Sequence, residues 1–128
     1  MKKVIAATIT LAVILTGCAQ ESNSADLTVA EFSAKSQEAG VISLDVRTAQ
    51  EFAEGHLKNA ININVESGNF EKEIANLDKT ATYAVYCRSG RRSQVAIDRM
   101  KAAGFTNLFN LNAGVQEWAA AGLPLVTN

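Results

Sequence analysis

Short apolar runs rich in β-branched residues alternate with segments of helical periodicity, and this alternation most constrains the fold. The expected strands cover residues 41–46, 60–65, 81–86 and 105–111. The expected helices cover residues 28–40, 48–55, 70–77, 93–103 and 114–121. Such alternation favours a parallel sheet, because each helix carries the chain back across one face of the sheet. The sequence therefore predicts one α/β domain with a central, mostly parallel sheet and helices on both faces.

The first 17 residues do not belong to this domain. Lys2 and Lys3 precede an apolar run, residues 4–15, which has the order of a secretory signal peptide and is short for a membrane span. The segment from Leu15 to Cys18 resembles the lipobox of bacterial lipoproteins. That resemblance implies lipidation of Cys18, removal of residues 1–17, and an exported protein on a bacterial membrane that faces the periplasm or the cell exterior. The alternative is an ordinary signal peptide that contains a Cys.

The remaining chain divides into a tether and a domain. Residues 18–26 are mostly polar and lack periodicity, which predicts a tether. Residues 27–128 form the expected domain, and their length and apolar content suffice for one core. Loss of Lys2 and Lys3 leaves 10 basic residues against 13 acidic ones. This balance argues against a nucleic-acid partner.

Cys87 is the only thiol that remains if Cys18 carries lipid, so it has no disulfide partner within its own chain. It follows an expected strand and precedes a helix expected to begin at Ser93. Gly90 permits a tight curl in which successive amides point inward and form an anion-binding concavity. Those amides, the helix N-terminus and the nearby arginines favour a thiolate, with a pKa below the usual value of about 8.5. The alternative is a buried Cys that acts as a small apolar residue.

Residues 87–93, Cys-Arg-Ser-Gly-Arg-Arg-Ser, are similar to the active loop of single-domain rhodaneses, a family of sulfurtransferases. Further matches to that family are the segments 45–47, 51–52, 55–57, 60–63, 113–118 and 121–124. The resemblance covers residues 27–124, nearly all of the chain after the expected cleavage. Asn59 and Ala113 depart from the Gly that is common in the family, and neither lies in the loop.

The resemblance implies a rhodanese-like fold and a two-step sulfur transfer. Cys87 takes the outer sulfur of thiosulfate or a persulfide and then hands it to a thiol or to cyanide. The implied partners are a small anionic donor and one of these acceptors, which can belong to a protein. Covalent catalysis of this kind needs no metal or organic cofactor.

Cys87 is the expected nucleophile, and the expected substrate-binding residues are Arg88, Ser89, Gly90, Arg91, Arg92, Ser93 and Arg47. We expect Arg92 to lie closest to the loop and Arg88 to face the substrate. Ser93 either donates its hydroxyl to the site or only caps the helix. Arg47 either reaches toward the loop or pairs with Asp45 or Glu51. His56 is expected to stabilise a turn rather than to act as a base.

Four other functions compete with sulfur transfer. The domain can be a persulfide carrier with little turnover, or a rhodanese-like interaction module. A Cys-dependent phosphatase is less favoured, because such loops place an Arg six positions after the Cys, where this chain has Ser93. A thiol–disulfide oxidoreductase lacks its second Cys near Cys87.

Overall fold

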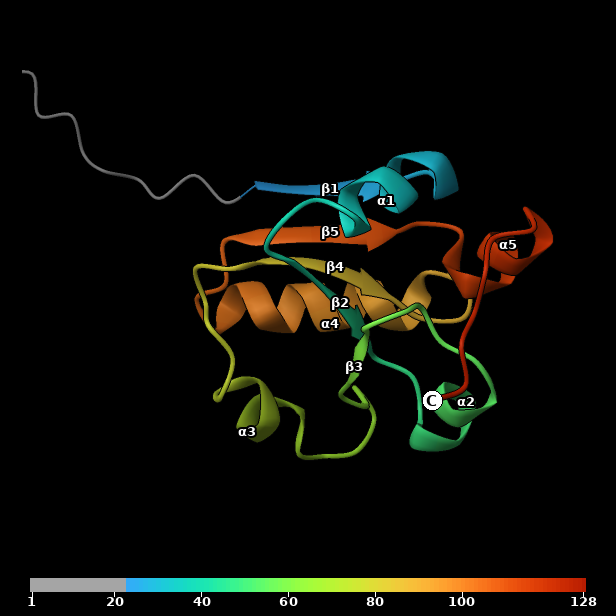
Figure 1. The fold of residues 1–128 in the computed structure, drawn as a ribbon. Coiled ribbons are helices and arrows are strands. Elements are labelled where there is room, and N and C mark those ends of the chain that lie inside the picture. The colour runs from blue at the N-terminus through green and yellow to red at the C-terminus, as the bar shows by residue number, and fades with distance from the viewer. Residues whose placement is uncertain (1–22) are drawn as a thin grey trace, which may run out of the picture.

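A five-stranded sheet forms the centre of the computed structural model, which describes residues 23–128 (Figure 1). The strands are β1 (Asn23–Leu27), β2 (Val41–Asp45), β3 (Ile61–Asn62), β4 (Thr82–Tyr86) and β5 (Asn107–Leu111). Their order across the sheet is β1-β5-β4-β2-β3, and every neighbouring pair runs parallel. The predicted α/β fold with a parallel sheet is confirmed.

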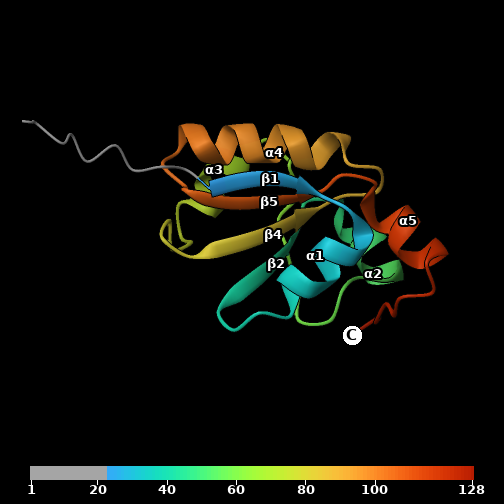
Figure 2. The same ribbon diagram turned by 90° about the horizontal axis from the view of Figure 1, so that it is seen from above.

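Helices cover both faces of this sheet (Figure 2). The helices are α1 (Val29–Ser36), α2 (Ala49–Glu54), α3 (Phe70–Ile74), α4 (Arg91–Ala102) and α5 (Gly114–Ala120). Helices α3 and α4 lie on one face, and α1 and α5 lie on the other. The short α2 lies beyond the ends toward which the strand arrows point. Within residues 23–128, no helix is long and apolar enough to cross a membrane.

Strand β4 divides the interior into two apolar clusters. Its side chains alternate between faces, as the twofold period of a strand requires. Tyr83 and Val85 pack toward α3 and α4, whereas Ala84 and Tyr86 pack toward α1 and α5. Cys87 continues the first series and belongs to the α3–α4 cluster. The sheet thus points the thiol at the start of α4.

The predicted tether is wrong for residues 23–26, because Asn23–Leu27 forms the edge strand β1. This strand pairs in parallel with β5, from Asn23 opposite Asn107 to Leu27 opposite Leu111. Its first four residues are exposed, so backbone pairing rather than an apolar pattern fixes it. The sequence therefore gave no periodic signal for it. The expected signal peptide, Cys18 and the rest of the tether lie outside the described residues.

Strand β3 is shorter than the predicted run of residues 60–65. Its parallel ladder with β2 covers only Ile61 and Asn62. The chain beyond it still bonds to the end of β2, since Ile63 N–H donates to the Asp45 carbonyl at 2.9 Å and Val65 N–H to the Val46 carbonyl at 3.1 Å. Ile63 and Val65 are therefore buried in the α3–α4 cluster, as an alternating strand pattern requires.

The buried Tyr86 hydroxyl provides a test of how the sheet holds the segment after α2. It accepts the Leu57 N–H at 3.1 Å, with both residues buried. We expect Tyr86→Phe to lower the free energy of unfolding by about 1–3 kcal/mol, because the Leu57 N–H loses its partner away from water. Urea denaturation measures this change.

Tyr83→Phe is the matched control. The Tyr83 hydroxyl donates to the carbonyl of Asp78. Because Asp78 is exposed, a water molecule can donate to this carbonyl when the hydroxyl is removed. We expect this variant to lose less than about 1 kcal/mol. A loss for Tyr83→Phe that equals or exceeds the loss for Tyr86→Phe contradicts the role given to the Tyr86 hydroxyl.

Candidate active site

Cys87 lies directly after β4, at the carboxyl end of the parallel sheet, where α/β folds place their binding sites. The residues that follow form a tight connection, and α4 begins at Arg91. The helix thus starts two residues earlier than predicted. Gly90 is the N-cap, with a left-handed φ of 95°. The short connection of residues 87–90, called the Cys87 loop below, keeps the sulfur under the first turn of α4.

Two glycines let the Cys87 loop lie against the turn between β5 and α5. A Cβ on Gly90 would sit 1.9 Å from the Asn112 carbonyl oxygen, and a Cβ on Gly114 would sit 2.1 Å from the Arg88 carbonyl oxygen. Both glycines also have positive φ, which other residues adopt at a cost. No side chain fits at either position without moving backbone.

The first amides of α5 bind the carbonyls of the Cys87 loop. Val115 N–H donates to the Cys87 carbonyl at 2.9 Å, and Gln116 N–H donates to the Arg88 carbonyl at 3.1 Å. These bonds satisfy helix N-terminal donors that have no partner within α5. The loop is therefore held from two sides, by α4 and by α5, and its amides remain directed toward the sulfur.

The Cys87 sulfur is surrounded by hydrogen-bond donors. Gly90 N–H donates to Sγ at 3.1 Å, and the Ser93 hydroxyl lies 3.4 Å from Sγ. Burial by itself raises the pKa of the thiol, but the Ser93 hydroxyl and the backbone amides of Ser93, Ser89 and Gly90 outweigh it. The pKa of Cys87 is therefore lowered, which favours the thiolate. The side chain itself is fully buried.

Ser93 serves the sulfur and does not cap the helix. Because α4 begins at Arg91, Ser93 lies in the first helical turn, and Gly90 occupies the cap position. Its side chain is fully buried against Cys87, so it lies below the surface that a substrate meets. Of the two roles predicted for Ser93, the structure supports the hydroxyl donor.

The three arginines of the predicted loop have different surroundings. Arg88 and Arg91 are exposed, and within residues 23–128 neither forms an ion pair. Arg92 is partly buried, and its two terminal nitrogens donate to the Glu51 carboxylate at 2.7 and 2.8 Å. Glu51, in the first turn of α2, thus joins the site from a segment 41 positions away in the chain.

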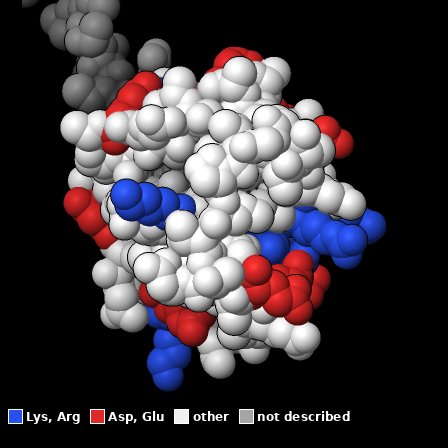
Figure 3. Space-filling view, turned by 45° about the vertical axis from the view of Figure 1, so that its right-hand side comes forward, with Lys and Arg blue, Asp and Glu red and all other residues white. Residues whose placement is uncertain are grey.

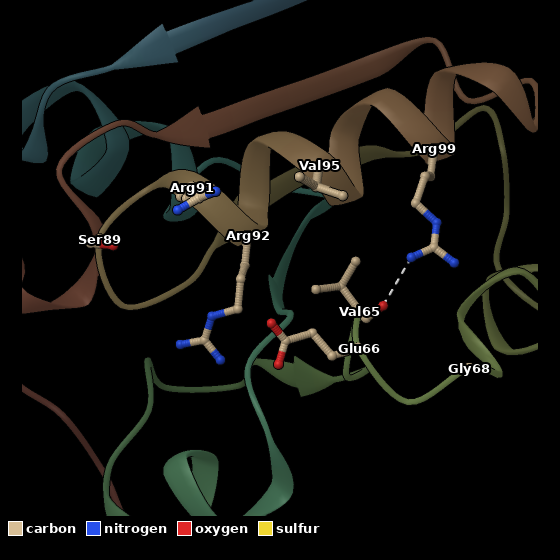
Figure 4. A pocket seen from close by; sticks show the side chains of 8 residues that line it. All are labelled: Val65, Glu66, Gly68, Ser89, Arg91, Arg92, Val95 and Arg99. Atoms are coloured by element: carbon tan, nitrogen blue, oxygen red, sulfur yellow. Dashed lines mark hydrogen bonds between the residues drawn. The ribbon is translucent and has the colours of Figure 1, made fainter.

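An open groove of about 680 Å³ adjoins the Cys87 loop along α4 (Figure 4). Its lining residues are Val65, Glu66, Gly68, Ser89, Arg91, Arg92, Val95 and Arg99. Arg99 closes the far end, where it donates to the Val65 carbonyl at 2.9 Å and pairs with Glu71. Within the described part of the chain, no three His, Cys, Asp or Glu side chains gather as metal ligands.

Arg47 does not join the predicted substrate-binding residues. It is buried, and its guanidinium donates to the Asp45 carboxylate, with the shortest contact at 2.6 Å, and to the Gly55 carbonyl at 2.7 Å. These bonds fix the turn between β2 and α2, because they tie the end of the strand to the end of the helix. Of the roles considered for Arg47, the structure supports the pair with Asp45.

His56 stabilises a turn, as predicted. Its ring stacks on Phe52 with centroids 3.7 Å apart, and Nδ1 lies 2.8 Å from the Phe52 carbonyl oxygen. Its backbone pairs with Val126. These contacts account for the burial of the side chain and leave it no role beside the sulfur.

Glu51 is the site residue that sequence reasoning did not place. Thr48 and Glu51 have the spacing of an N-cap residue and its partner in the first helical turn, and the Glu51 N–H donates to the Thr48 hydroxyl at 3.2 Å. Nothing in the local sequence indicates a partner on α4. The pairing follows from the sheet order, which sets β2 beside β4 and so brings the segments after these strands together.

Known proteins share this fold and this segment order. The family described as Rhodanese-like domain matches residues 28–121. A sulfurtransferase of Allochromatium vinosum is 31% identical over 86 residues, which cover 67% of this chain and 78% of that protein. The chloroplastic thiosulfate sulfurtransferase 16 of Arabidopsis thaliana is 35% identical over 67% of this chain and 80% of its own length.

A solved structure agrees with these sequence matches. The crystal structure of a rhodanese-related protein from Thermoplasma volcanium superposes with a TM-score of 0.71 at 26% identity, over 80% of this chain and 98% of that chain. The family match covers β2 to β5 and the Cys87 loop between them. The chain therefore belongs to the family of rhodanese-like domains.

Proposed function

We propose that this protein transfers sulfane sulfur through a persulfide on Cys87. The observation that carries the proposal is the donor set around the sulfur, namely the Gly90 amide and the Ser93 hydroxyl beneath the start of α4. A group held in this way is ionised more readily and is a better nucleophile. Membership of a family with sulfurtransferase relatives supports the same chemistry.

The reaction has two steps. The Cys87 thiolate attacks the outer sulfur of thiosulfate or of a persulfide, a Cys87 Sγ–S bond forms, and sulfite or a thiolate leaves with the electron pair of the broken bond. A thiol or cyanide then attacks the outer sulfur of Cys87 and regenerates the thiolate. The same amides and hydroxyl that stabilise the thiolate also stabilise the negative persulfide. Arg88 and Arg91, which are exposed beside the loop, attract the anionic donor.

Burial of Cys87 sets a condition on this reaction. Because the side chain has no exposed surface, a donor reaches the sulfur only when the Cys87 loop shifts. The bonds from α5 and the close contacts at Gly90 and Gly114 oppose such a shift. This observation favours a second candidate function, a persulfide carrier that protects its bound sulfur and turns over slowly.

We further propose that lipid on Cys18 anchors the protein to a bacterial membrane, where it faces the periplasm or the cell exterior. The support is the order of basic residues, apolar run and Cys in residues 1–18. The described domain begins with β1 at Asn23, so only four residues separate Cys18 from the folded part. The domain is thus expected to lie close to the membrane surface.

Removal of the nucleophile tests the proposed function. We expect the wild-type protein to gain about 32 Da, one sulfur atom, after treatment with thiosulfate or a persulfide. Cys87→Ser is expected to show no gain and less than about one per cent of the turnover, because the covalent intermediate cannot form. Intact-mass analysis and thiocyanate release measure the two quantities. A wild-type chain that gains sulfur but turns over negligibly identifies the carrier.

The Ser93 hydroxyl provides a test of the electrostatic argument. We expect Ser93→Ala to raise the pKa of Cys87, since a hydrogen bond to the thiolate is lost. The rate of sulfur loading then falls about tenfold at neutral pH and recovers at alkaline pH, where the thiol ionises in both proteins. Loading rates measured across pH show this shift.

Ser89→Ala is the matched control, because Ser89 acts on the sulfur through its backbone amide, which the substitution keeps. Its pH profile is expected to coincide with that of the wild type. Coincident profiles for Ser93→Ala and the wild type would remove the hydroxyl from the ionisation of Cys87.

The anchor is tested by Cys18→Ser in the full chain. We expect the variant to leave the membrane fraction, because stable attachment depends on the acyl chains. Fractionation followed by immunoblotting measures the distribution. Cys87→Ser serves as the control and is expected to stay with the membrane. A Cys18→Ser protein that remains in the membrane fraction rules out the lipid on Cys18.

A further inference from the structure

Glu51 neutralises Arg92, a groove arginine that also interacts electrostatically with Cys87. The Glu51 carboxylate binds both terminal nitrogens of Arg92, an arrangement that holds the guanidinium plane in one orientation. The hydrogen bonds from Arg92 lower the pKa of Glu51 to about 2, so the carboxylate is charged at every physiological pH. Arg92 interacts electrostatically with Cys87 and with Glu66 as well. The positive charge of Arg92 is therefore largely compensated by these neighbouring groups before any donor binds.

The whole groove has balanced charge. Three arginines, Arg91, Arg92 and Arg99, and one carboxylate, Glu66, line it. Arg92 pairs with Glu51, and Arg99 pairs with Glu71. Figure 3 shows basic and acidic atoms lying side by side on this end of the molecule. Only Arg91 lacks an ion pair among residues 23–128 at this groove. Arg88 also lacks an ion pair within residues 23–128 but is not among the residues that line the groove. A groove with one available positive charge gives a dianion little advantage over a monoanion bound within it.

The groove also offers an apolar surface that an inorganic anion does not use. Val65 and Val95 point into the same space between Arg92 and Arg99 (Figure 4). Val95 is 48% exposed, although it is a large apolar residue on the helix that holds the sulfur loop. With about 680 Å³, the groove, which Ser89 of the Cys87 loop helps to line, has room for an organic body.

We propose that the site is selective for monoanionic organic sulfur donors, such as thiosulfonates and organic persulfides, and that Glu51 sets this preference by its ion pair with Arg92. The apolar body of the donor lies on the exposed Val95, in the part of the groove that Val65 also lines, and its negative end is met by Arg91. Glu51 acts as a positioning residue, since it works through Arg92. This inference rests on the proposed sulfur transfer through Cys87.

The reaction with such a donor is balanced without any other reagent. The Cys87 thiolate attacks the outer sulfur of a thiosulfonate, and the bond between that sulfur and the sulfonyl sulfur breaks. The leaving group is a sulfinate, which keeps the electron pair, and the new negative charge lies on the outer sulfur of the Cys87 persulfide. With an organic persulfide as donor, the leaving group is the corresponding thiolate.

Thiosulfate and methanethiosulfonate test the role of charge, since they carry two and one negative charges on the same reacting group. We expect Glu51→Gln to raise the ratio of kcat/KM for thiosulfate to that for methanethiosulfonate about fivefold. The substitution removes the carboxylate charge that compensates Arg92, while the amide oxygen of Gln still accepts a hydrogen bond from it. A ratio within each protein cancels the different reactivities of the donors. Loss of folding or of general activity moves both values together and leaves the ratio unchanged.

Glu54→Gln is the matched control, because Glu54 lies exposed on the same short helix and forms no ion pair within the described residues. We expect its ratio to stay within about twofold of the wild type. A Glu51→Gln ratio that equals that of the wild type, or a Glu54→Gln ratio that rises as much, overturns the role of Glu51.

Benzenethiosulfonate tests the apolar surface, because it has the charge of methanethiosulfonate and a larger body. We expect the ratio of kcat/KM for the benzene compound to that for the methane compound to fall about threefold in Val95→Ser. Leu125→Ser, at an exposed apolar residue outside the groove, is expected to leave the ratio unchanged. An unchanged ratio in Val95→Ser overturns the placement of the organic body.

A failure of sulfur transfer and a failure of donor selectivity give different experimental results. If no donor adds sulfur to Cys87 in the intact-mass measurement, the proposed function is wrong and the selectivity falls with it. If every donor loads Cys87 but the ratios do not respond to Glu51→Gln or Val95→Ser, sulfur transfer stands and the selectivity is wrong.

Discussion

The contact between the Cys87 loop and the turn after β5 is the constraint on which the site depends. Gly90 approaches the Asn112 carbonyl, Gly114 approaches the Arg88 carbonyl, and the first amides of α5 bind the loop from below. This contact exists only because β4 and β5 are neighbours in a parallel sheet, so that their carboxyl ends meet. The sheet order therefore determines the shape of the loop, and the loop shape directs its amides at one sulfur atom.

That arrangement sets two opposing effects on Cys87. Burial disfavours the charged thiolate, whereas the Ser93 hydroxyl and the loop amides favour it, and the balance lowers the pKa. An exposed thiol with the same pKa would need fewer donors but would be open to oxidation. In this chain the sulfur is both ionisable and covered. In the proposed sulfur transfer, access to Cys87 then depends on movement of a loop that is held on two sides, which links the rate to the stability of the loop.

Much of the fold follows from local pattern, because buried strands and helix caps leave periodic or positional signals. The strand before Cys87 and the short helix after Thr48 were both evident in the sequence. Strand β1 was not, since an exposed edge strand is fixed by backbone pairing with β5 rather than by apolar side chains. The start of α4 was placed late because a left-handed Gly90 can cap a helix without a side-chain oxygen.

The charge distribution of the site could be predicted from the sequence even less well than the positions of the helices and strands. Three arginines in seven residues indicate a positive loop, yet only Arg92 among them is held by an ion pair within the described residues, and its partner comes from α2. Sequence counts the guanidinium groups, whereas the field at Cys87 depends on which carboxylates the fold brings to them. Glu51 and Glu71 convert an apparently cationic helix face into a balanced one, with an apolar strip between the pairs. In the selectivity proposed above, such a site distinguishes donors by charge and by organic body together, which a positive loop alone does not.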